Sequence, residues 1–291
     1  MLMIATGING RQSGMVMTAD STAIFYRTFG AGQPLLIING GPGMNSDGFQ
    51  GLATSLSKNL KTIIFDQRGT GKSVLKRVDS TTITMALMIS DIESLRKQLG
   101  LKSWSVLGHS FGGMVASAYA TVHPGVIDKI VLSASGGIDL GLLDYFRASL
   151  NSKLTAAELD TIEYWAARME GVEGQYARLQ RAKVLAHAYV LDTTYYPVIA
   201  ERLTQINPEV NQLMWDNLYR IHFDCRKYLR DVDIPVLIIQ GKQDIVRPQT
   251  AEDANKAFRN SRIVYMDHCI HYGWLDNPEV YFKEVIGFLG A

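Results

Sequence analysis

Short apolar runs and longer segments of helical period alternate along most of this chain. Continuous apolar runs are typical of strands buried in a parallel sheet. Such runs occupy residues 34–38, 61–65, 104–107, 127–132, 235–240 and 262–266, and residues 22–29 are rich in β-forming types. Segments of helical period occupy residues 46–58, 84–99, 114–121, 251–258 and 278–289. This alternation predicts an α/β fold in which helices connect the strands of a mostly parallel sheet.

The pattern changes between residues 137 and 228. Strand signals are absent from this segment, its period is helical, and Tyr and Trp residues are frequent in it. We interpret the segment as an all-helical cap that is inserted into the α/β domain. The expected α/β domain therefore consists of two stretches, residues 1–136 and 229–291, with the cap at residues 137–228 between them.

A glycine-rich motif lies between the strand at 104–107 and the helix that follows it. Gly-His-Ser-Phe-Gly at residues 108–112 matches the Gly-x-Ser-x-Gly pattern of a nucleophile elbow. A serine in this motif sits on a strained turn from strand to helix, where larger neighbours would collide with the backbone. Because the motif also opens a helix of small residues, we expect Ser110 to be a catalytic nucleophile.

A serine hydroxyl needs a base, and the base needs an acid that orients it. In the fold that uses this elbow, the chain order is serine, acid, histidine. Asp244 follows the strand at 235–240, and His271 lies between the last strand and the last helix, so both match that order. The alternatives are His268 as the base and either Asp267 or Asp276 as the acid.

The loop Asn39-Gly40-Gly41-Pro42-Gly43 follows the strand at 34–38. Two backbone N–H groups that point at a developing oxyanion stabilise acyl transfer by a few kcal/mol. We expect these donors to be the N–H groups of Gly41 and Phe111. Phe111 and Met114 are expected to line or underlie the substrate pocket. His109 is expected to have a packing role, with a contact to the substrate pocket as the alternative.

Composition narrows the function classes. The chain has 291 residues, of which 47% are apolar and 20% charged, so it is not disordered. A net charge of +1 gives no support for binding to nucleic acid or to an anionic membrane. No apolar run is long enough to span a membrane, and residues 1–14 lack the pattern of a signal peptide, so a cytoplasmic protein is expected.

Two further motifs have structural interpretations. Cys225 and Cys269 fit neither a disulfide framework nor a metal site, and we expect two free, buried thiols.

The run Gly69-Thr70-Gly71-Lys72-Ser73 is similar to the end of a phosphate-binding loop. That loop requires a further glycine five positions before its second glycine, where this chain has Asp66, so nucleotide binding is not expected.

Taken together, these motifs resemble the α/β-hydrolase superfamily, and within it the proline iminopeptidase-like branch. Residues 39–43 are similar to the His-Gly-Gly-Pro-Gly of that branch, residues 66–73 to its Asp-Gln-Arg-Gly-x-Gly-x-Ser, and residues 271–279 to the superfamily's histidine loop and final helix. The resemblance implies an eight-stranded, mostly parallel sheet flanked by helices, a helical cap and no cofactor or metal. It implies a small-molecule or short-peptide substrate.

The chain departs from that branch at three places. Asn39 replaces a histidine, and the elbow reads Gly-His-Ser-Phe-Gly-Gly where the aminopeptidases have Gly-Gly-Ser-Trp-Gly. Lys242 lies before the expected acid, where its charge would oppose a substrate ammonium. Cap acids that could hold such an ammonium are Glu163, Glu170, Glu173, Glu201, Glu209 and Asp216.

The sequence therefore predicts a serine hydrolase that forms an acyl-enzyme. One hypothesis is a proline iminopeptidase-like aminopeptidase. The alternative is an esterase, lactonase, amidase or C–C hydrolase that acts on a small apolar substrate, as the aromatic residues of the cap suggest. A ligand receptor that keeps the fold without catalysis is a third hypothesis. The sequence carries no signal for an oligomeric state.

Overall fold

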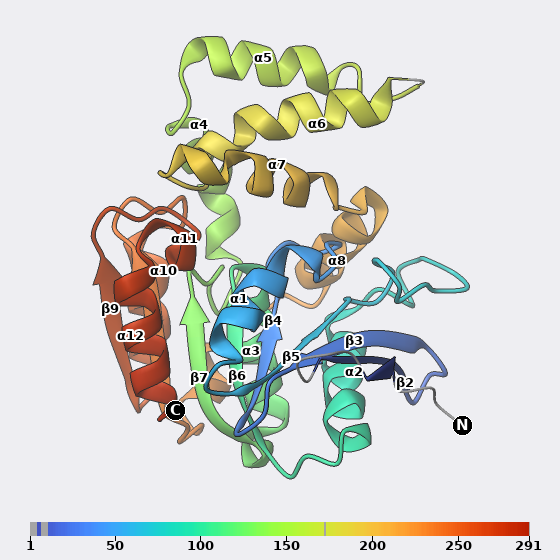
Figure 1. Cartoon of the computed structure of the whole chain (residues 1–291), viewed down its shortest axis with the longest axis vertical. Coiled ribbons are helices and arrows are strands. Elements are labelled where there is room, and N and C mark those ends of the chain that lie inside the picture. The colour runs from blue at the N-terminus through green and yellow to red at the C-terminus, as the bar shows by residue number, and fades with distance from the viewer. Residues whose placement is uncertain (1–4, 7–10, 172, 291) are drawn as a thin grey trace.

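Figure 1 shows the computed structural model of the chain, which describes residues 5–6, 11–171 and 173–290. Residues 1–4 and 7–10, on which part of the expectation about a signal peptide rests, lie outside the described residues. The strands are β1 (Ala5–Thr6), β2 (Gln12–Met17), β3 (Ala23–Phe29), β4 (Pro34–Ile38), β5 (Lys61–Phe65), β6 (Trp104–His109), β7 (Ile127–Ser133), β8 (Val236–Gly241) and β9 (Ser261–Met266).

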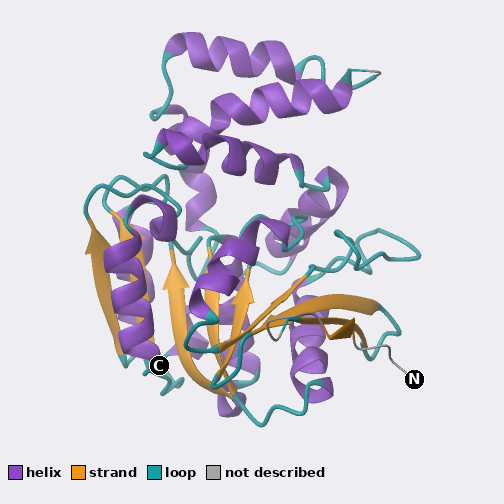
Figure 2. Cartoon of the chain, in the orientation of Figure 1, coloured by secondary structure: helices purple, strands orange, loops and turns teal. Residues whose placement is uncertain are grey.

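The α-helices fall into two groups. Those that alternate with the strands are α1 (Gln50–Leu56), α2 (Met85–Gln98), α3 (Phe111–Val122), α10 (Pro248–Ala257), α11 (Gly273–Asp276) and α12 (Pro278–Leu289). Those between β7 and β8 are α4 (Phe146–Asn151), α5 (Ala156–Ala166), α6 (Gly174–Leu185), α7 (Tyr196–Thr204), α8 (Pro208–Arg220) and α9 (Arg226–Leu229). Figure 2 shows that the upper part of the molecule contains helices and loops and that the strands lie below them.

The described strands form one sheet in the order β1-β2-β3-β5-β4-β6-β7-β8-β9. Strands β4 to β9 are parallel to one another, whereas β1, β2 and β3 pair antiparallel. The predicted eight-stranded, mostly parallel sheet is confirmed, and the two-residue β1 extends it at one edge. The sequence pattern did not predict β2, because only the second half of this short strand is apolar.

The apolar residues of the central strands alternate between two clusters. Leu36 and Ile38 of β4 belong to one cluster, together with residues of α2 and α3. Leu35 and Ile37 of the same strand belong to the other, together with residues of α1 and α12. Because successive side chains of a strand point to opposite faces, the sheet is buried on both faces. This double burial explains why its strands appear in the sequence as continuous apolar runs.

A buried ion pair fixes the loop after β5. The Arg68 guanidinium donates to both carboxylate oxygens of Asp91 on α2, at 2.7 Å from Nε and 2.6 Å from Nη2. Both residues are 1% exposed. Arg68 also donates to the Thr82 carbonyl at 2.8 Å. The two planar groups meet in the bidentate geometry that makes such pairs specific.

The same loop supports the loop after β4. Asp66 accepts hydrogen bonds from the N–H of Ser46 (2.9 Å) and from the N–H of Lys72 (2.9 Å). The Gln67 amide donates to the Asn39 carbonyl at 3.0 Å. Residues 66–73, which are similar in sequence to part of a phosphate-binding loop, therefore have a structural role next to the expected oxyanion loop.

The Arg68–Asp91 pair predicts a stability effect. We expect Asp91→Ala to lower the free energy of unfolding by about 3 kcal/mol, because the buried guanidinium then keeps only the partly exposed Asp20, at 3.2 Å, as a carboxylate partner. We expect the double variant Arg68→Met, Asp91→Leu to recover much of this loss. Urea denaturation of the three proteins measures both effects, and a wild-type midpoint for D91A would show that the pair does not stabilise the fold.

Candidate active site

The turn from β6 to α3 carries Ser110. Its backbone has φ 54° and ψ −121°, a sparsely populated conformation that costs of order 1–3 kcal/mol in a residue other than glycine. Three hydrogen bonds hold the turn. The Ser110 N–H donates to the Ser133 carbonyl at 3.0 Å, and the Ser110 carbonyl accepts from the N–H groups of Gly113 (2.8 Å) and Gly136 (2.9 Å). A methyl group on Gly112 would overlap the carbonyl oxygen of Ile38. The elbow therefore requires glycine at position 112.

His271 and Asp244 come together at the same edge of the sheet. His271 Nδ1 lies 2.8 Å from Asp244 Oδ1, and their side chains are 3% and 0% exposed. The Val246 N–H also donates to Asp244 Oδ1, at 3.0 Å. Because Nδ1 is bound to the carboxylate, Nε2 is the nitrogen that is available to a nucleophile.

Ser110 and His271 line one cavity of about 290 Å³. The hydrogen bonds of the described residues include none between Ser110 Oγ and the His271 ring. Such bonds are often long or poorly aligned before substrate binds. The structure thus brings the three residues predicted for catalysis to one site and shows the acid–histidine half of their hydrogen-bond chain.

Main-chain contacts fix the distance between the acid loop and the histidine loop. A methyl group on Gly241 would overlap the carbonyl oxygens of Cys269 and Ile270. The Gln243 N–H donates to the Cys269 carbonyl at 3.1 Å. Asp244 and His271 therefore meet because their two loops touch backbone to backbone.

The alternative base and one alternative acid lie away from this cavity. His268 and Asp267 are both exposed. Asp267 pairs with Lys242, whose Nζ lies 2.8 Å from Asp267 Oδ1. Lys242 is not among the residues that line the cavity. The sequence analysis expected the charge of Lys242 to oppose a substrate ammonium. In the structure, this charge is paired with Asp267 and lies outside the cavity lining.

The second alternative acid connects the histidine loop to the segment before α7. The Asp276 carboxylate accepts hydrogen bonds from the Ile270 N–H (2.8 Å) and from the Leu191 N–H (2.7 Å). The His271 N–H donates to the Tyr189 carbonyl at 3.0 Å. Asp276 thus has its own backbone partners, and the segment around Tyr189 helps to hold the base.

The expected oxyanion donors both line the cavity. Among the described residues, the N–H groups of Gly41 and Phe111 donate no hydrogen bond to another protein group. Asn39 braces the loop that contains Gly41: its side-chain amide donates to the carbonyls of Met44 (3.0 Å) and Gly40 (3.2 Å). Asn39 therefore has a supporting role at the position where the similar branch has histidine.

Arg202 of α7 is a site residue that the sequence did not reveal. It is 2% exposed, and its guanidinium donates to the Gly40 carbonyl (2.9 Å) and to the Tyr272 hydroxyl (3.0 Å). The Gly40 carbonyl and the Gly41 N–H belong to one peptide group, so the arginine charge polarises this group and strengthens its N–H as a donor. A single arginine on a helix matches no motif, and no local signal identifies it.

The remainder of the cavity is mostly apolar. Its apolar lining includes Leu142, Leu143, Phe146, Leu203, Ile206 and Trp215. Phe111 packs edge-on against Trp215, with ring centroids 5.9 Å apart. Met114 is fully buried in the core and is not among the lining residues.

His109 precedes the nucleophile and is buried among aromatic rings. Its ring centroid lies 4.7 Å from that of His271, 4.9 Å from that of Trp274 and 5.0 Å from that of Tyr272. Among the described residues, neither ring nitrogen forms a well-aligned hydrogen bond. Burial, with smaller electrostatic contributions from the neighbouring His271 and Arg202 side chains, lowers the pKa of His109 well below its ordinary value. The ring is therefore neutral and packs as an aromatic group.

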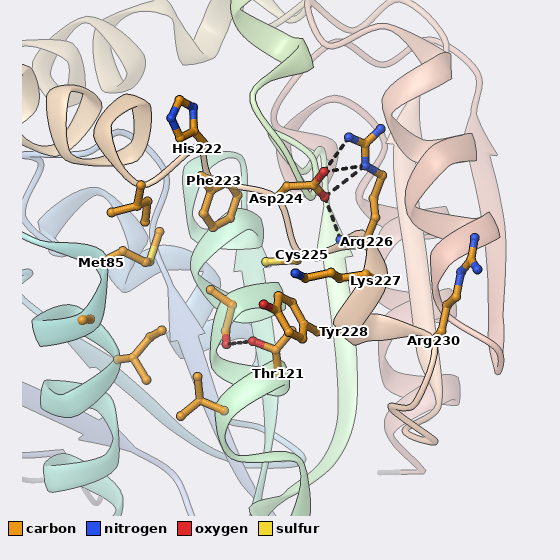
Figure 3. Close-up of a pocket in the computed structure, with 15 residues that line it drawn as sticks. Met85, Thr121, His222, Phe223, Asp224, Cys225, Arg226, Lys227, Tyr228 and Arg230 are labelled. Atoms are coloured by element: carbon orange, nitrogen blue, oxygen red, sulfur yellow. Dashed lines mark hydrogen bonds and ion pairs between the residues drawn. The ribbon is translucent and has the colours of Figure 1, made fainter.

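A larger hollow, of about 910 Å³, lies away from these residues. Figure 3 shows its lining, which includes residues of α2 and α3 and the segment that contains Cys225. The Arg226 guanidinium pairs there with Asp224, with Nε 3.0 Å from Oδ1. Burial raises the pKa of the Cys225 thiol to about 12, so it is not a nucleophile near neutral pH. Volume alone therefore does not identify the active site.

Three further observations concern the described residues. Both cysteines are free and buried, as expected. Within residues 5–6, 11–171 and 173–290, no cluster of metal-binding side chains occurs. No helix in that part of the chain has the length and apolar character needed to cross a membrane.

A family model described as alpha/beta hydrolase fold matches residues 33–278. The chain therefore belongs to the α/β-hydrolase fold family, and the predicted fold class is confirmed. Relatives of this chain include several proteins with the name proline iminopeptidase. The protein from Heyndrickxia coagulans is 25% identical over 272 residues, which cover 90% of this chain and 92% of the relative. The protein from Xylella fastidiosa is 36% identical over 121 residues, which cover 41% of this chain and 38% of the relative.

Solved structures have the same fold. VinJ matches with a TM-score of 0.78 at 19% identity, over 96% of this chain and 98% of that chain. Proline iminopeptidase from Mycobacterium smegmatis matches with a TM-score of 0.73 at 22% identity, over 96% and 97%. An esterase from Exiguobacterium antarcticum matches with a TM-score of 0.73 at 20% identity, over 95% and 99%. With the family match, these comparisons confirm the predicted resemblance and support an enzyme of the serine hydrolase type.

The close contact at Gly112 predicts a sharp effect of one methyl group. We expect Gly112→Ala to destabilise the protein and to abolish labelling of Ser110 by a fluorophosphonate, because the new Cβ displaces α3 from β4. Gly51 of α1 has open space around its Cα, so Gly51→Ala is the matched control and keeps wild-type labelling. Gel-based labelling and thermal unfolding of both variants test this, and normal labelling of G112A contradicts the proposed packing.

The neutral, buried His109 predicts a pH effect. Its folded-state pKa lies below the unfolded value of about 6.5, so its contribution to stability is complete above that pH and is lost as the pH falls. Between pH 8 and pH 5 we expect wild type to lose more stability than His109→Phe, by at most about 2 kcal/mol at about 1.4 kcal/mol per pH unit below pH 6.5. Urea denaturation at the two pH values measures this difference. Equal losses in the two proteins would show that His109 is protonated in the folded state.

Proposed function

We propose that this chain is a serine hydrolase in which Ser110 is the nucleophile, His271 the base and Asp244 the orienting acid. The observation that carries the proposal is the buried bond of 2.8 Å between His271 Nδ1 and Asp244 Oδ1, in a site whose cavity is also lined by the strained Ser110. Membership of the α/β-hydrolase fold family supports it. The chain order of the three residues also agrees with this fold.

In the proposed reaction, Ser110 Oγ forms a bond to a substrate carbonyl carbon while its proton passes to His271 Nε2. The carbonyl electron pair moves onto the oxygen, and the N–H groups of Gly41 and Phe111 stabilise that negative charge. His271 then gives the proton to the leaving group as the bond to it breaks. Water attacks the acyl-enzyme by the same steps and releases Ser110.

We also propose the division of the chain into a hydrolase domain, residues 1–136 and 229–291, and a cap, residues 137–228. In support, the described part of residues 137–228 contains helices and no strand of the sheet. Figure 1 shows α5, α6 and α7 stacked beyond the carboxyl ends of the parallel strands. Phe146, Tyr189 and Trp215 of this segment line the cavity beside Ser110.

The cavity favours a small molecule or short peptide with an apolar group next to the reacting carbonyl. The relatives with the name proline iminopeptidase support an aminopeptidase. An aminopeptidase must bind a substrate ammonium, and the described lining of the catalytic cavity includes no Asp or Glu. Of the six cap acids considered for this contact, Glu170 and Glu201 line cavities that share side chains with the catalytic one, and both are exposed. The geometry therefore favours esters, lactones or amides without a free amine.

Parallel rate measurements test the proposal. We expect hydrolysis of p-nitrophenyl butyrate at a rate that falls about ten-thousandfold in Ser110→Ala. Proline p-nitroanilide, assayed beside it, decides between the two substrate hypotheses. Turnover of the anilide that depends on Ser110 would support the aminopeptidase, whereas turnover of the ester alone supports the other hydrolases.

Matched variants test the other two residues. We expect His271→Ala and Asp244→Asn each to lose most activity, whereas the nearby, exposed His268→Ala and Asp267→Asn keep wild-type rates. A folded wild-type protein whose Ser110 does not react with a fluorophosphonate would contradict the serine hydrolase. Full activity of H271A or D244N would contradict the assignment of that residue.

A further inference from the structure

A second cavity adjoins the catalytic one. It has a volume of about 720 Å³ and lies among α4, α5, α6 and α7. The two cavities share Met44, Phe146, Tyr189, Leu203 and Ile206 in their linings. A substrate that reacts at Ser110 can therefore extend a longer arm past these side chains into the second cavity.

One face of α6 gives the second cavity its charge. Arg178, Arg181, Ala182 and Leu185 line it from that helix, at the spacing of three and four residues that places side chains on one face. Arg147 lines it from α4, and Glu170 is the one acidic residue in the described lining. The lining thus has an excess of positive charge.

Arg181 differs from the other charged residues of this cavity. Arg147, Arg178 and Glu170 are exposed, whereas Arg181 is partly buried. The Nε of Arg181 is buried without a hydrogen-bond partner. Among the described residues, the Arg181 guanidinium forms no ion pair with a carboxylate. Burial lowers the pKa of its guanidinium, which nevertheless remains charged at neutral pH.

An unpartnered buried charge is costly in a protein interior. The more deeply buried Arg68 has a carboxylate partner within 2.6 Å, and the buried Arg96 has one within 2.7 Å. In the part of the chain that the structure describes, the buried Arg202 has no carboxylate partner either, but its guanidinium donates to the Gly40 carbonyl and to the Tyr272 hydroxyl. Among the described residues, the guanidinium of Arg181 has neither kind of partner, although it lines a cavity that adjoins the catalytic one. A carboxylate matches the fork of N–H donors that a guanidinium presents.

We propose that the second cavity binds a carboxylate on the substrate, with Arg181 as its principal ligand. This inference rests on the proposed function, since it assigns a substrate class to the same site. The substrate would combine an apolar segment beside Ser110 with a carboxylate at some distance from the reacting carbonyl. Such a substrate differs in charge from a peptide that is recognised by a free N-terminal amine.

Paired esters test the inference. The first pair is p-nitrophenyl hydrogen suberate and p-nitrophenyl octanoate, which place a carboxylate or a methyl group at the end of the acyl chain. The second pair is the butyrate ester of ω-hydroxyhexanoic acid and hexyl butyrate, which differ in the alcohol part. We expect wild type to prefer the carboxylate in one pair by about ten- to a hundredfold in kcat/KM, the effect of one charge-assisted hydrogen-bonded contact.

Variants of α6 assign the preference to Arg181. We expect Arg181→Gln to abolish the preference for the carboxylate ester by raising the KM for that ester. Turnover of the neutral esters stays within about twofold of wild type. Arg181→Lys, which keeps the charge, restores part of the preference. Lys183→Gln removes a charge from an exposed position of the same helix and leaves the preference unchanged. Loss of the preference in K183Q, or its persistence in R181Q, would overturn the inference.

Binding to an inactive protein separates this inference from the proposed mechanism. We expect suberate to bind Ser110→Ala in a calorimeter, more tightly than its monoamide, and to bind about tenfold or more weakly when Arg181→Gln is added. If no ester is hydrolysed but suberate binds in this way, the mechanism fails and the carboxylate site stands. If neutral esters are hydrolysed through Ser110 but suberate does not bind, the carboxylate site fails alone.

Discussion

The close approach of main-chain segments at one edge of the sheet is the constraint on which this site depends. Gly112 brings α3 against the carbonyl of Ile38 at the end of β4, and Gly241 brings the loop after β8 against the carbonyl of Cys269. No side chain fits at either contact. The nucleophile, its expected oxyanion donors, the acid and the histidine are therefore positioned by the backbone of separate strands rather than by flexible side chains.

The helical segment contributes to the catalytic geometry as well as to the cavity wall. The Tyr189 carbonyl accepts the N–H of His271, and Arg202 binds the loop that carries Gly41. Asp276 joins the histidine loop to the backbone at Leu191. Because these bonds connect residues far apart in the sequence, a change that loosens the helices is expected to alter the position of the base as well as the shape of the pocket.

The sequence predicted the parts of this structure that depend on local patterns. Apolar runs located the strands of the doubly buried sheet, and the spacing of small residues around Ser110 located the elbow. Chain order gave Asp244 and His271, and the structure places those two together. The sequence did not predict Arg202, because its importance comes from contacts with Gly40 and Tyr272 that only the folded chain creates.

The cap was predictable as a helical segment but not as an environment for a substrate. The packing of α4, α5 and α7 against α6 decides which face of α6 lines the cavity. Helical periodicity in the sequence does not define that packing. The charge of the pocket is a consequence of this packing. The family match therefore supports the proposed chemistry at the sheet edge, whereas we propose that the arginines of the helical segment select the substrate. Sequence similarity to enzymes named for one substrate does not determine the substrate of this chain, because a few side chains on one helix face can reverse the charge of the pocket that a substrate enters.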